Sequence, residues 1–204
     1  MDSASAGHPA PLRWLVDEWQ WPYATTFAAC FLLALIPIVY SAAGIAATLI
    51  YAQLPVYMVH QLEEHRGDRF RRYVNSELGG GRELLTPLTT FAINLLAVWV
   101  LMVAAFFLAY YVNPALGLIA VYLTAANALV HVGAALGRRA YNPGLLTAVL
   151  LFVPLSAWGA IEVNSDYTAS TGVQALAIGI AVLGHLAIVA AIAARQAALR
   201  RATS

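Results

Sequence analysis

The sequence predicts an all-α integral membrane bundle of about six transmembrane helices, with both termini on the cytoplasmic side. Composition is the first reason: 61% of the 204 residues are hydrophobic and only 10% are charged, whereas soluble domains are about 45–50% apolar and about 25% charged. The second is the length of the apolar stretches, which suffices for spans of about 20 residues each. The third is the placement of the arginines, which gather in alternate connections between these stretches.

One membrane domain with two short terminal segments is the expected organisation. We expect an N-terminal tail with an interfacial aromatic segment over residues 1–23, a single membrane-embedded helical domain over residues 24–195, and a basic tail over residues 196–204. A chain of this length suits one compact domain rather than two.

The N-terminal segment is rich in tryptophan. Residues 1–12 lack the basic region and apolar core of a cleavable signal peptide, so we expect the first span to be retained. Beyond them, charged residues alternate with Trp14, Trp19 and Trp21. This pattern is typical of a short helix lying among lipid headgroups, and a mobile tail is the alternative.

The first long apolar run, residues 24–59, contains no charged residue and is too long for one span. Its weakest point is the Ser-Ala-Ala-Gly sequence at residues 41–44, where we expect a turn. Pro37 and Pro55 are each predicted to mark a kink. The two expected helices cover residues 21–40 and 44–64.

The rest of the chain alternates between apolar segments and polar connections. A polar connection with five arginines and a flexible triple-glycine turn is expected at residues 66–83. Turns on the opposite side are expected at Asn113-Pro114 and in a polar loop at residues 162–168. The four expected helices cover residues 87–111, 115–136, 141–161 and 172–194.

The arginines indicate the topology. Those that follow the first predicted span lie at residues 66–82, at Arg138-Arg139 and at residues 195–201, after alternate spans. An even number of spans brings all three groups to one face, as the positive-inside tendency requires, whereas five or seven spans would divide them. The predicted location is therefore the cell (inner) membrane, with cytoplasmic termini.

Charge and cysteine content exclude several kinds of site. A net charge of +1 argues against a nucleic-acid partner, because phosphate binding needs a clustered basic surface. The single cysteine, Cys30, permits no internal disulfide and no cysteine-based metal cluster, so a metal would need histidine and carboxylate ligands. Cys30 itself is expected to be a small buried hydrophobe.

Several polar residues inside the predicted helices lie at one depth, near the arginine-bearing ends. Polar groups at such positions are costly, so their convergence favours a functional site. Interhelical hydrogen bonds, worth about 0.6 kcal/mol on average, are the simpler explanation for Asn94 or His185 taken alone. The residues at this depth are His60, Glu63, Glu64, Asn94, Asn127, His131 and His185.

The motif at residues 60–65 has a defined helical geometry. At roughly 100° per residue, Glu63 and Glu64 are the i+3 and i+4 neighbours of His60 and share its face. His65 points away from His60 and is expected to belong to the cytoplasmic loop. Either glutamate could instead be the solvated end of its helix.

The spacing His60-x-x-Glu63-Glu64 resembles the signature of the HXXEE domain family, small multi-pass membrane proteins named for that motif. The family is also marked by an asparagine and a histidine, which Asn127 and His131 match, and the Tyr-Asn-Pro-Gly sequence at residues 141–144 is similar to its usual continuation. The resemblance covers roughly residues 53–158 and implies an enzymatic role without naming a substrate.

The first functional hypothesis is an enzyme acting on a lipophilic substrate, such as a lipid, terpenoid or sterol-like molecule, by metal-assisted hydrolysis or oxidation. His60, Glu64, His131 and His185 would bind zinc or iron, and Glu63 would be a general base beside metal-bound water. Asn127 would support a ligand or orient the substrate. The candidate catalytic residues are therefore His60, Glu63, Glu64, Asn127 and His131.

Other hypotheses use the same residues. A metal-free isomerase or cyclase could use a carboxyl group desolvated at the lipid boundary as its acid. A proton-coupled transporter could use the same groups as a relay, and a structural membrane subunit would need no chemistry. Membrane lipid and a lipophilic small molecule are the expected partners, and the oligomeric state stays open.

Overall fold

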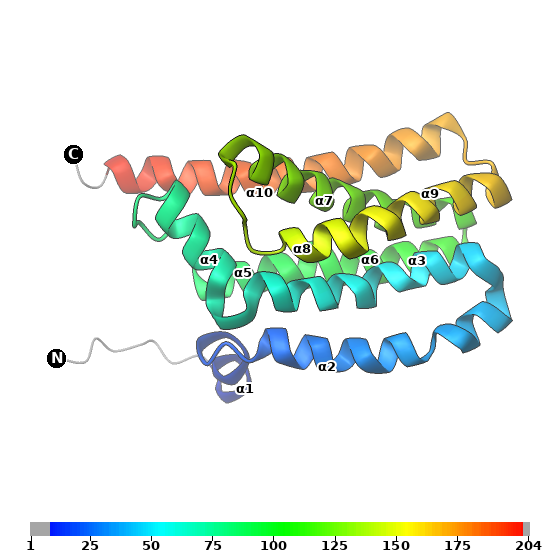
Figure 1. The fold of residues 1–204 in the computed structure, drawn as a ribbon, viewed down its shortest axis with the longest axis horizontal. Coiled ribbons are helices and arrows are strands. Elements are labelled where there is room, and N and C mark those ends of the chain that lie inside the picture. The colour runs from blue at the N-terminus through cyan, green and yellow to red at the C-terminus, as the bar shows by residue number, and fades with distance from the viewer. Residues whose placement is uncertain (1–8, 202–204) are drawn as a thin grey trace.

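The computed structural model describes residues 9–201, and these residues form helices and turns without any strand. The helices lie side by side along a common axis (Figure 1). Five helical segments are long and apolar enough to cross a membrane: Ile36–Leu78, Pro87–Tyr111, Pro114–Arg138, Leu145–Tyr167 and Thr171–Arg201. The prediction of an all-α chain with several apolar spans is therefore confirmed.

The first two predicted helices are divided at an additional point. Helix α2 (Trp21–Ala34) is followed, after Leu35, by helix α3 (Ile36–His65). Inside α3 the backbone of Gly44 is non-helical, with φ 76°, and only glycine adopts such angles readily. This is the point at which the sequence predicts a turn, and the part of α3 beyond it packs against α2 (Figure 1).

Of the two prolines expected to mark kinks, Pro37 lies at the break between α2 and α3, whereas Pro55 lies away from both breaks. Pro37 occupies the first turn of α3, where its missing N–H leaves no helical hydrogen bond unmade. Pro55 lies inside α3, with helical backbone on both sides.

Residues 66–83, expected to be a polar loop, are mostly helical. They form η2 (Arg66–Asp68), α4 (Arg69–Tyr73) and η3 (Val74–Leu78) before the chain turns at the three glycines. An i,i+3 ion pair between Arg71 and Asp68 stabilises this segment locally. Charged composition alone therefore misidentified a helical segment as a loop.

The third and fourth predicted helices agree closely with the structure. The third is formed by α5 (Pro87–Ala92), the π-helical η4 (Ile93–Val100) and α6 (Leu101–Tyr111). The fourth is formed by the short η5 (Pro114–Gly117) and α7 (Leu118–Arg138).

The last two helices extend beyond their predicted ends. The fifth consists of α8 (Leu145–Thr147), η6 (Ala148–Phe152) and α9 (Val153–Tyr167), so most of the expected polar loop at 162–168 is helical. The sixth, α10 (Thr171–Arg201), continues past residue 194 and includes most of the expected basic tail. Residues 1–8 and 202–204, which the sequence assigns to the terminal tails, lie outside the described residues.

The N-terminal aromatic segment packs against the bundle. It forms α1 (Ala10–Leu12) and η1 (Arg13–Asp17), and Val16 is fully buried. The indole N–H of Trp19 donates to the backbone carbonyl of His65 at 2.7 Å. The segment therefore contacts the end of α3.

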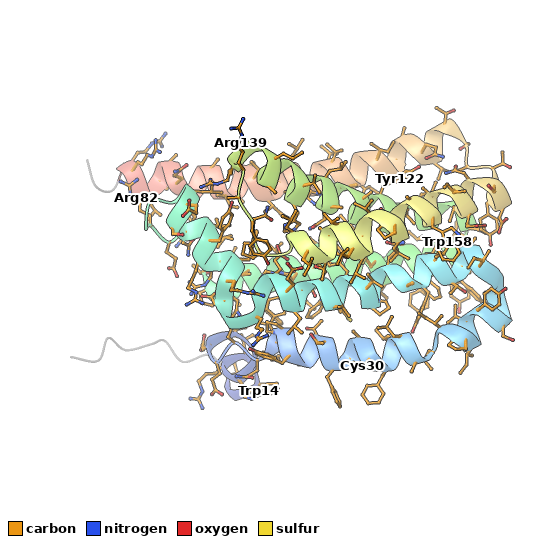
Figure 2. The ribbon with its side chains drawn as sticks, viewed as in Figure 1. Trp14, Cys30, Arg82, Tyr122, Arg139 and Trp158 are labelled. Atoms are coloured by element: carbon orange, nitrogen blue, oxygen red, sulfur yellow. The ribbon has the colours of Figure 1, made fainter. Side chains whose placement is uncertain are left out.

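The outer surface is strongly apolar, as expected for helices surrounded by lipid. Phe27, Phe31 and Leu183 are each more than 60% exposed. Cys30 is also exposed on α2 (Figure 2), so the expectation that it is buried is wrong. Sequence apolarity does not distinguish a core position from a lipid-facing one, because both environments favour the same residues.

Arginines mark one end of the bundle. Figure 2 shows Arg82 and Arg139 at the end where α4 lies, whereas Tyr122 and Trp158 lie toward the other. The last turn of α10, which carries Arg200 and Arg201, reaches the same end (Figure 1). We refer to it below as the arginine-rich end.

Candidate functional site

Three ionisable side chains from two helices meet inside the bundle. His60 and Glu64 lie one turn apart on α3, and His131 faces them from α7. One ligand atom of each lies within 4.8 Å of those of the other two, and all three residues are buried. His60 Nε2 is 3.6 Å from Glu64 Oε2, and His131 Nε2 is 3.7 Å from Glu64 Oε1.

Each imidazole is oriented by a side-chain oxygen at its other nitrogen. His131 Nδ1 lies 2.7 Å from Asn142 Oδ1, and the Asn142 amide nitrogen donates to the His131 carbonyl at 2.9 Å. His60 Nδ1 lies 2.8 Å from Thr147 Oγ1, whose own hydroxyl donates to Glu63 Oε2 at 2.5 Å. In both pairs the oxygen is therefore the acceptor, which places the imidazole proton on Nδ1.

This arrangement makes His60, His131 and Glu64 present hydrogen-bond acceptors to one another. With their protons on Nδ1, His60 and His131 present Nε2 lone pairs toward the carboxylate of Glu64. His60 Nε2 is buried and has no hydrogen-bond partner among the described residues. Buried acceptors without a donor are costly, so the cluster suits a bound cation or a shared proton.

Gly144 allows the chain to pass directly over both histidines. Its φ is +100°, and a Cβ atom at this position would lie 2.6 Å from His131 Cε1 and 2.8 Å from His60 Cε1. Any other residue would therefore collide with the imidazole rings. Glycine is required here for space as well as for backbone conformation.

Glu63 faces a different partner, the beginning of α8. Its carboxylate accepts hydrogen bonds from the backbone N–H groups of Leu146 (3.1 Å) and Thr147 (2.7 Å), from the Thr147 hydroxyl, and from the Tyr141 phenol (2.7 Å). A carboxylate has about four lone-pair sites, so all are engaged. Glu63 therefore caps α8 from another helix, satisfying N–H groups that a helix start leaves unpaired.

Tyr141 is fixed as a hydrogen-bond donor by this contact. Partial burial and the neighbouring Glu63 carboxylate raise the pKa of the Tyr141 phenol to about 12. Both disfavour the phenolate, so Tyr141 stays protonated at neutral pH.

His65 is buried, so its expected place in a solvated loop is wrong. It is 1% exposed at the end of α3, with Nε2 3.1 Å from Glu64 Oε2. The ring of Trp21 lies against it, with ring centroids 4.7 Å apart. The N-terminal segment covers this part of α3, so the burial of His65 could not be predicted from the sequence of α3 alone.

Asn127 lies in a second layer beside the cluster. Its amide nitrogen donates to the Tyr57 hydroxyl at 2.5 Å, and its Oδ1 is buried without a hydrogen-bond partner in the described chain. The Tyr57 ring stands edge-on to His60, with centroids 5.6 Å apart, and Phe152 packs on His60 at 4.3 Å. The cluster is therefore bordered by aromatic rings.

Two other residues predicted at this depth lie outside the cluster. His185 is half-buried on α10, with Nδ1 2.8 Å from the Ala181 carbonyl of its own helix. Asn94 instead accepts a hydrogen bond from Gln61 at 2.7 Å, and Gln61 in turn accepts one from Trp99 at 2.8 Å. Asn94 thus links η4 to α3, as the interhelical explanation expects.

Sequence reasoning did not assign Asn142, Gly144 or Thr147 to the site. Two of them belong to the Tyr-Asn-Pro-Gly sequence noted above as a family feature. An Asn-Pro-Gly sequence directly before a helix is typical of an ordinary turn. Only the folded structure shows that it lies against His60 and His131.

Comparison with known proteins gives one match. Residues 51–159 match the family described as "Protein of unknown function with HXXEE motif". Curated proteins and solved structures gave no match. The matched segment includes every residue of the cluster and of the chain that covers it, and it spans more than half of the sequence. The chain therefore belongs to the HXXEE family.

Proposed function

We propose that this protein is an integral-membrane enzyme acting on a lipophilic substrate, with His60, Glu64 and His131 binding a catalytic divalent metal. The observation that carries the proposal is the convergence of the Nε2 lone pairs of His60 and His131 on the carboxylate of Glu64, whose other close neighbour is His65 Nε2 at 3.1 Å. Such a set is the usual ligand set of zinc or iron in proteins.

The spacing of the three ligand atoms can be compared with that around a bound zinc ion. Ligands of tetrahedral zinc lie about 2.0–2.1 Å from the ion, and therefore about 3.4 Å from one another. The shortest nitrogen–oxygen distances, 3.6 and 3.7 Å, involve the two different oxygens of Glu64, and one ligand atom of each residue lies within 4.8 Å of those of the other two. The three side chains would therefore have to move closer together to bind the ion.

Three protein ligands leave a coordination position for water or substrate, which distinguishes catalytic from structural sites. With zinc, His60, Glu64 and His131 would hold an ion that activates water for the hydrolysis of an ester-type bond. With iron and dioxygen, the same ligands would support oxidation.

The surrounding residues have distinct proposed roles. Asn142 and Thr147 orient the two histidines, as supporting residues of metal sites commonly do. Glu63 positions α8 rather than serving as a general base, because its lone pairs are engaged. Asn127, with a free buried oxygen, is placed to orient a substrate group.

The proposed topology has six spans and places both termini in the cytoplasm, in a cell (inner) membrane. Chain reversal at Gly44 supports counting α2, with the first part of α3, as a separate span. The arginine-rich end would then face the cytoplasm.

Elemental analysis of the protein purified in detergent tests the metal. We expect about one zinc or iron per chain, lost in His60→Ala and His131→Ala but kept in His185→Ala, which removes a histidine outside the cluster. The metal found also separates hydrolysis from oxidation. A folded wild-type protein that takes up neither metal would contradict the metal enzyme and favour the acid–base alternative, with a proton shared in the cluster.

A further inference from the structure

A groove lies at the arginine-rich end, beside the loop that covers His60 and His131. Its volume is about 630 Å³, and its lining includes Arg69, Arg72, Tyr73, Ser76, Tyr141 and Pro143. None of the residues that line it carries a carboxylate. The groove therefore presents hydrogen-bond donors and positive charge to whatever enters it.

The two groove arginines differ from other arginines at this end. The guanidinium groups of Arg69 and Arg72 donate to the backbone carbonyls of Glu63 and Gly67, and neither forms an ion pair with a carboxylate of residues 9–201. By contrast, Arg138 is paired with Glu77, and Arg71 with Asp68 and Glu83. Two positive charges thus remain available for an external anion.

An exposed apolar surface continues from the groove. Tyr141, which lines it, and the N–H of Leu146 bind the same carboxylate oxygen of Glu63, at 2.7 and 3.1 Å. Leu146 and Leu150, one turn further along the fifth helix, are 57% and 61% exposed. A molecule with an anionic head and an apolar tail would match both surfaces at once.

The groove also adjoins the cluster. Pro143 forms part of its wall, and it stands between Asn142, which orients His131, and Gly144, which lies against both imidazole rings. One short loop therefore separates an anion in the groove from His60 and His131.

We propose that this groove binds the phosphate head group of an amphiphilic substrate, with the tail along Leu146 and Leu150. Two guanidinium groups match the charge of a phosphate monoester, about −1.5 to −2 at pH 7. Arginine is also the residue best suited to bind phosphate oxygens in pairs. This inference rests on the proposed function, because it takes the bound amphiphile to be the substrate on which the enzyme acts.

Binding of short-chain phosphatidic acid to the detergent-solubilised full chain tests the groove, with tryptophan fluorescence as the readout. We expect the double variant Arg69→Gln/Arg72→Gln to bind about tenfold or more weakly, since two charge-assisted contacts are lost. The matched control is Arg82→Gln/Arg139→Gln, which removes two positive charges from the same end (Figure 2). We expect that control to change the affinity less than about twofold, because neither arginine lines the groove.

Two further titrations identify the ligand. Short-chain phosphatidylcholine, whose phosphate is shielded by choline, and inorganic phosphate, which lacks a tail, should both bind much more weakly than phosphatidic acid. Equal binding of inorganic phosphate would overturn the amphiphile proposal, as would equal losses in the two double variants.

Metal content, measured on the same samples, should be unchanged in Arg69→Gln/Arg72→Gln. Wild-type protein that binds the lipid but no metal would refute the proposed metal enzyme and would still support lipid binding in the groove.

Discussion

At the scale of single residues, two glutamates that are adjacent in the sequence face different partners. Glu64 lies between His60 and His131, whereas Glu63 turns toward Tyr141 and Thr147. The difference follows from the roughly 100° between successive helical side chains. One carboxylate can therefore face the cluster while its neighbour holds the next helix.

Asn142 is the residue whose replacement best tests how the histidines are oriented. Asn142→Ala removes the oxygen that keeps the His131 proton on Nδ1, and we expect metal affinity to fall about 10–100-fold. The measurement is a competition titration with a chelator of known affinity. Asn127→Ala, which removes an amide that binds Tyr57 instead, should stay within a few fold of wild type. Unchanged affinity in Asn142→Ala would show that this contact does not position the ligand.

At the scale of elements, the fifth helix begins at a carboxylate supplied by α3. The N-cap residue Gly144 offers no side-chain acceptor, and Glu63 satisfies the N–H groups of Leu146 and Thr147 in its place. The same contact brings Thr147 to His60 and Asn142 to His131. The start of this helix and the geometry of the cluster are therefore coupled.

Glu63→Ala should accordingly lower the stability of the whole protein. Loss of a cap costs about 0.5–2 kcal/mol, so we expect a lower thermal midpoint in detergent and weaker metal binding. Glu77→Ala is the matched control: it removes a glutamate whose ion pair with Arg138 is exposed, and such pairs contribute about 0–1 kcal/mol. Equal midpoints in the two variants would refute a capping role for Glu63.

At the scale of the whole molecule, lipid-facing helices enclose a small polar interior. Large apolar side chains such as Phe27 and Leu183 cover the outside, while the buried ionisable groups gather toward the arginine-rich end. The cluster itself is buried, and one short loop separates it from the groove that contains Arg69 and Arg72.

Cysteine labelling of intact cells tests the proposed topology. Starting from Cys30→Ala, a single cysteine at Arg82 should be protected from a membrane-impermeant maleimide, because the arginine-rich end is expected to be cytoplasmic. A single cysteine at Ser170, in the connection between α9 and α10, should be labelled. The reverse pattern, or labelling of both, would refute the proposed orientation.

The sequence by itself determined the all-α class, the limits of the third and fourth helices, the turn at Gly44 and the family. These features depend on local chemistry: apolar length, glycine conformation and the fixed spacing of His60, Glu63 and Glu64. His60, Glu64 and His131 were also predicted together, because buried polar residues at one depth are rarely accidental.

Only the tertiary structure decided what each residue contacts. Glu63 meets Thr147 across 84 positions of sequence, His65 is buried beneath the N-terminal segment, and His185 faces its own helix. The exposure of Cys30 could not be predicted from the sequence either, because lipid and protein core favour the same apolar residues. Periodicity fixes which face of a helix a side chain occupies, but the partner of that face is set by how the helices pack.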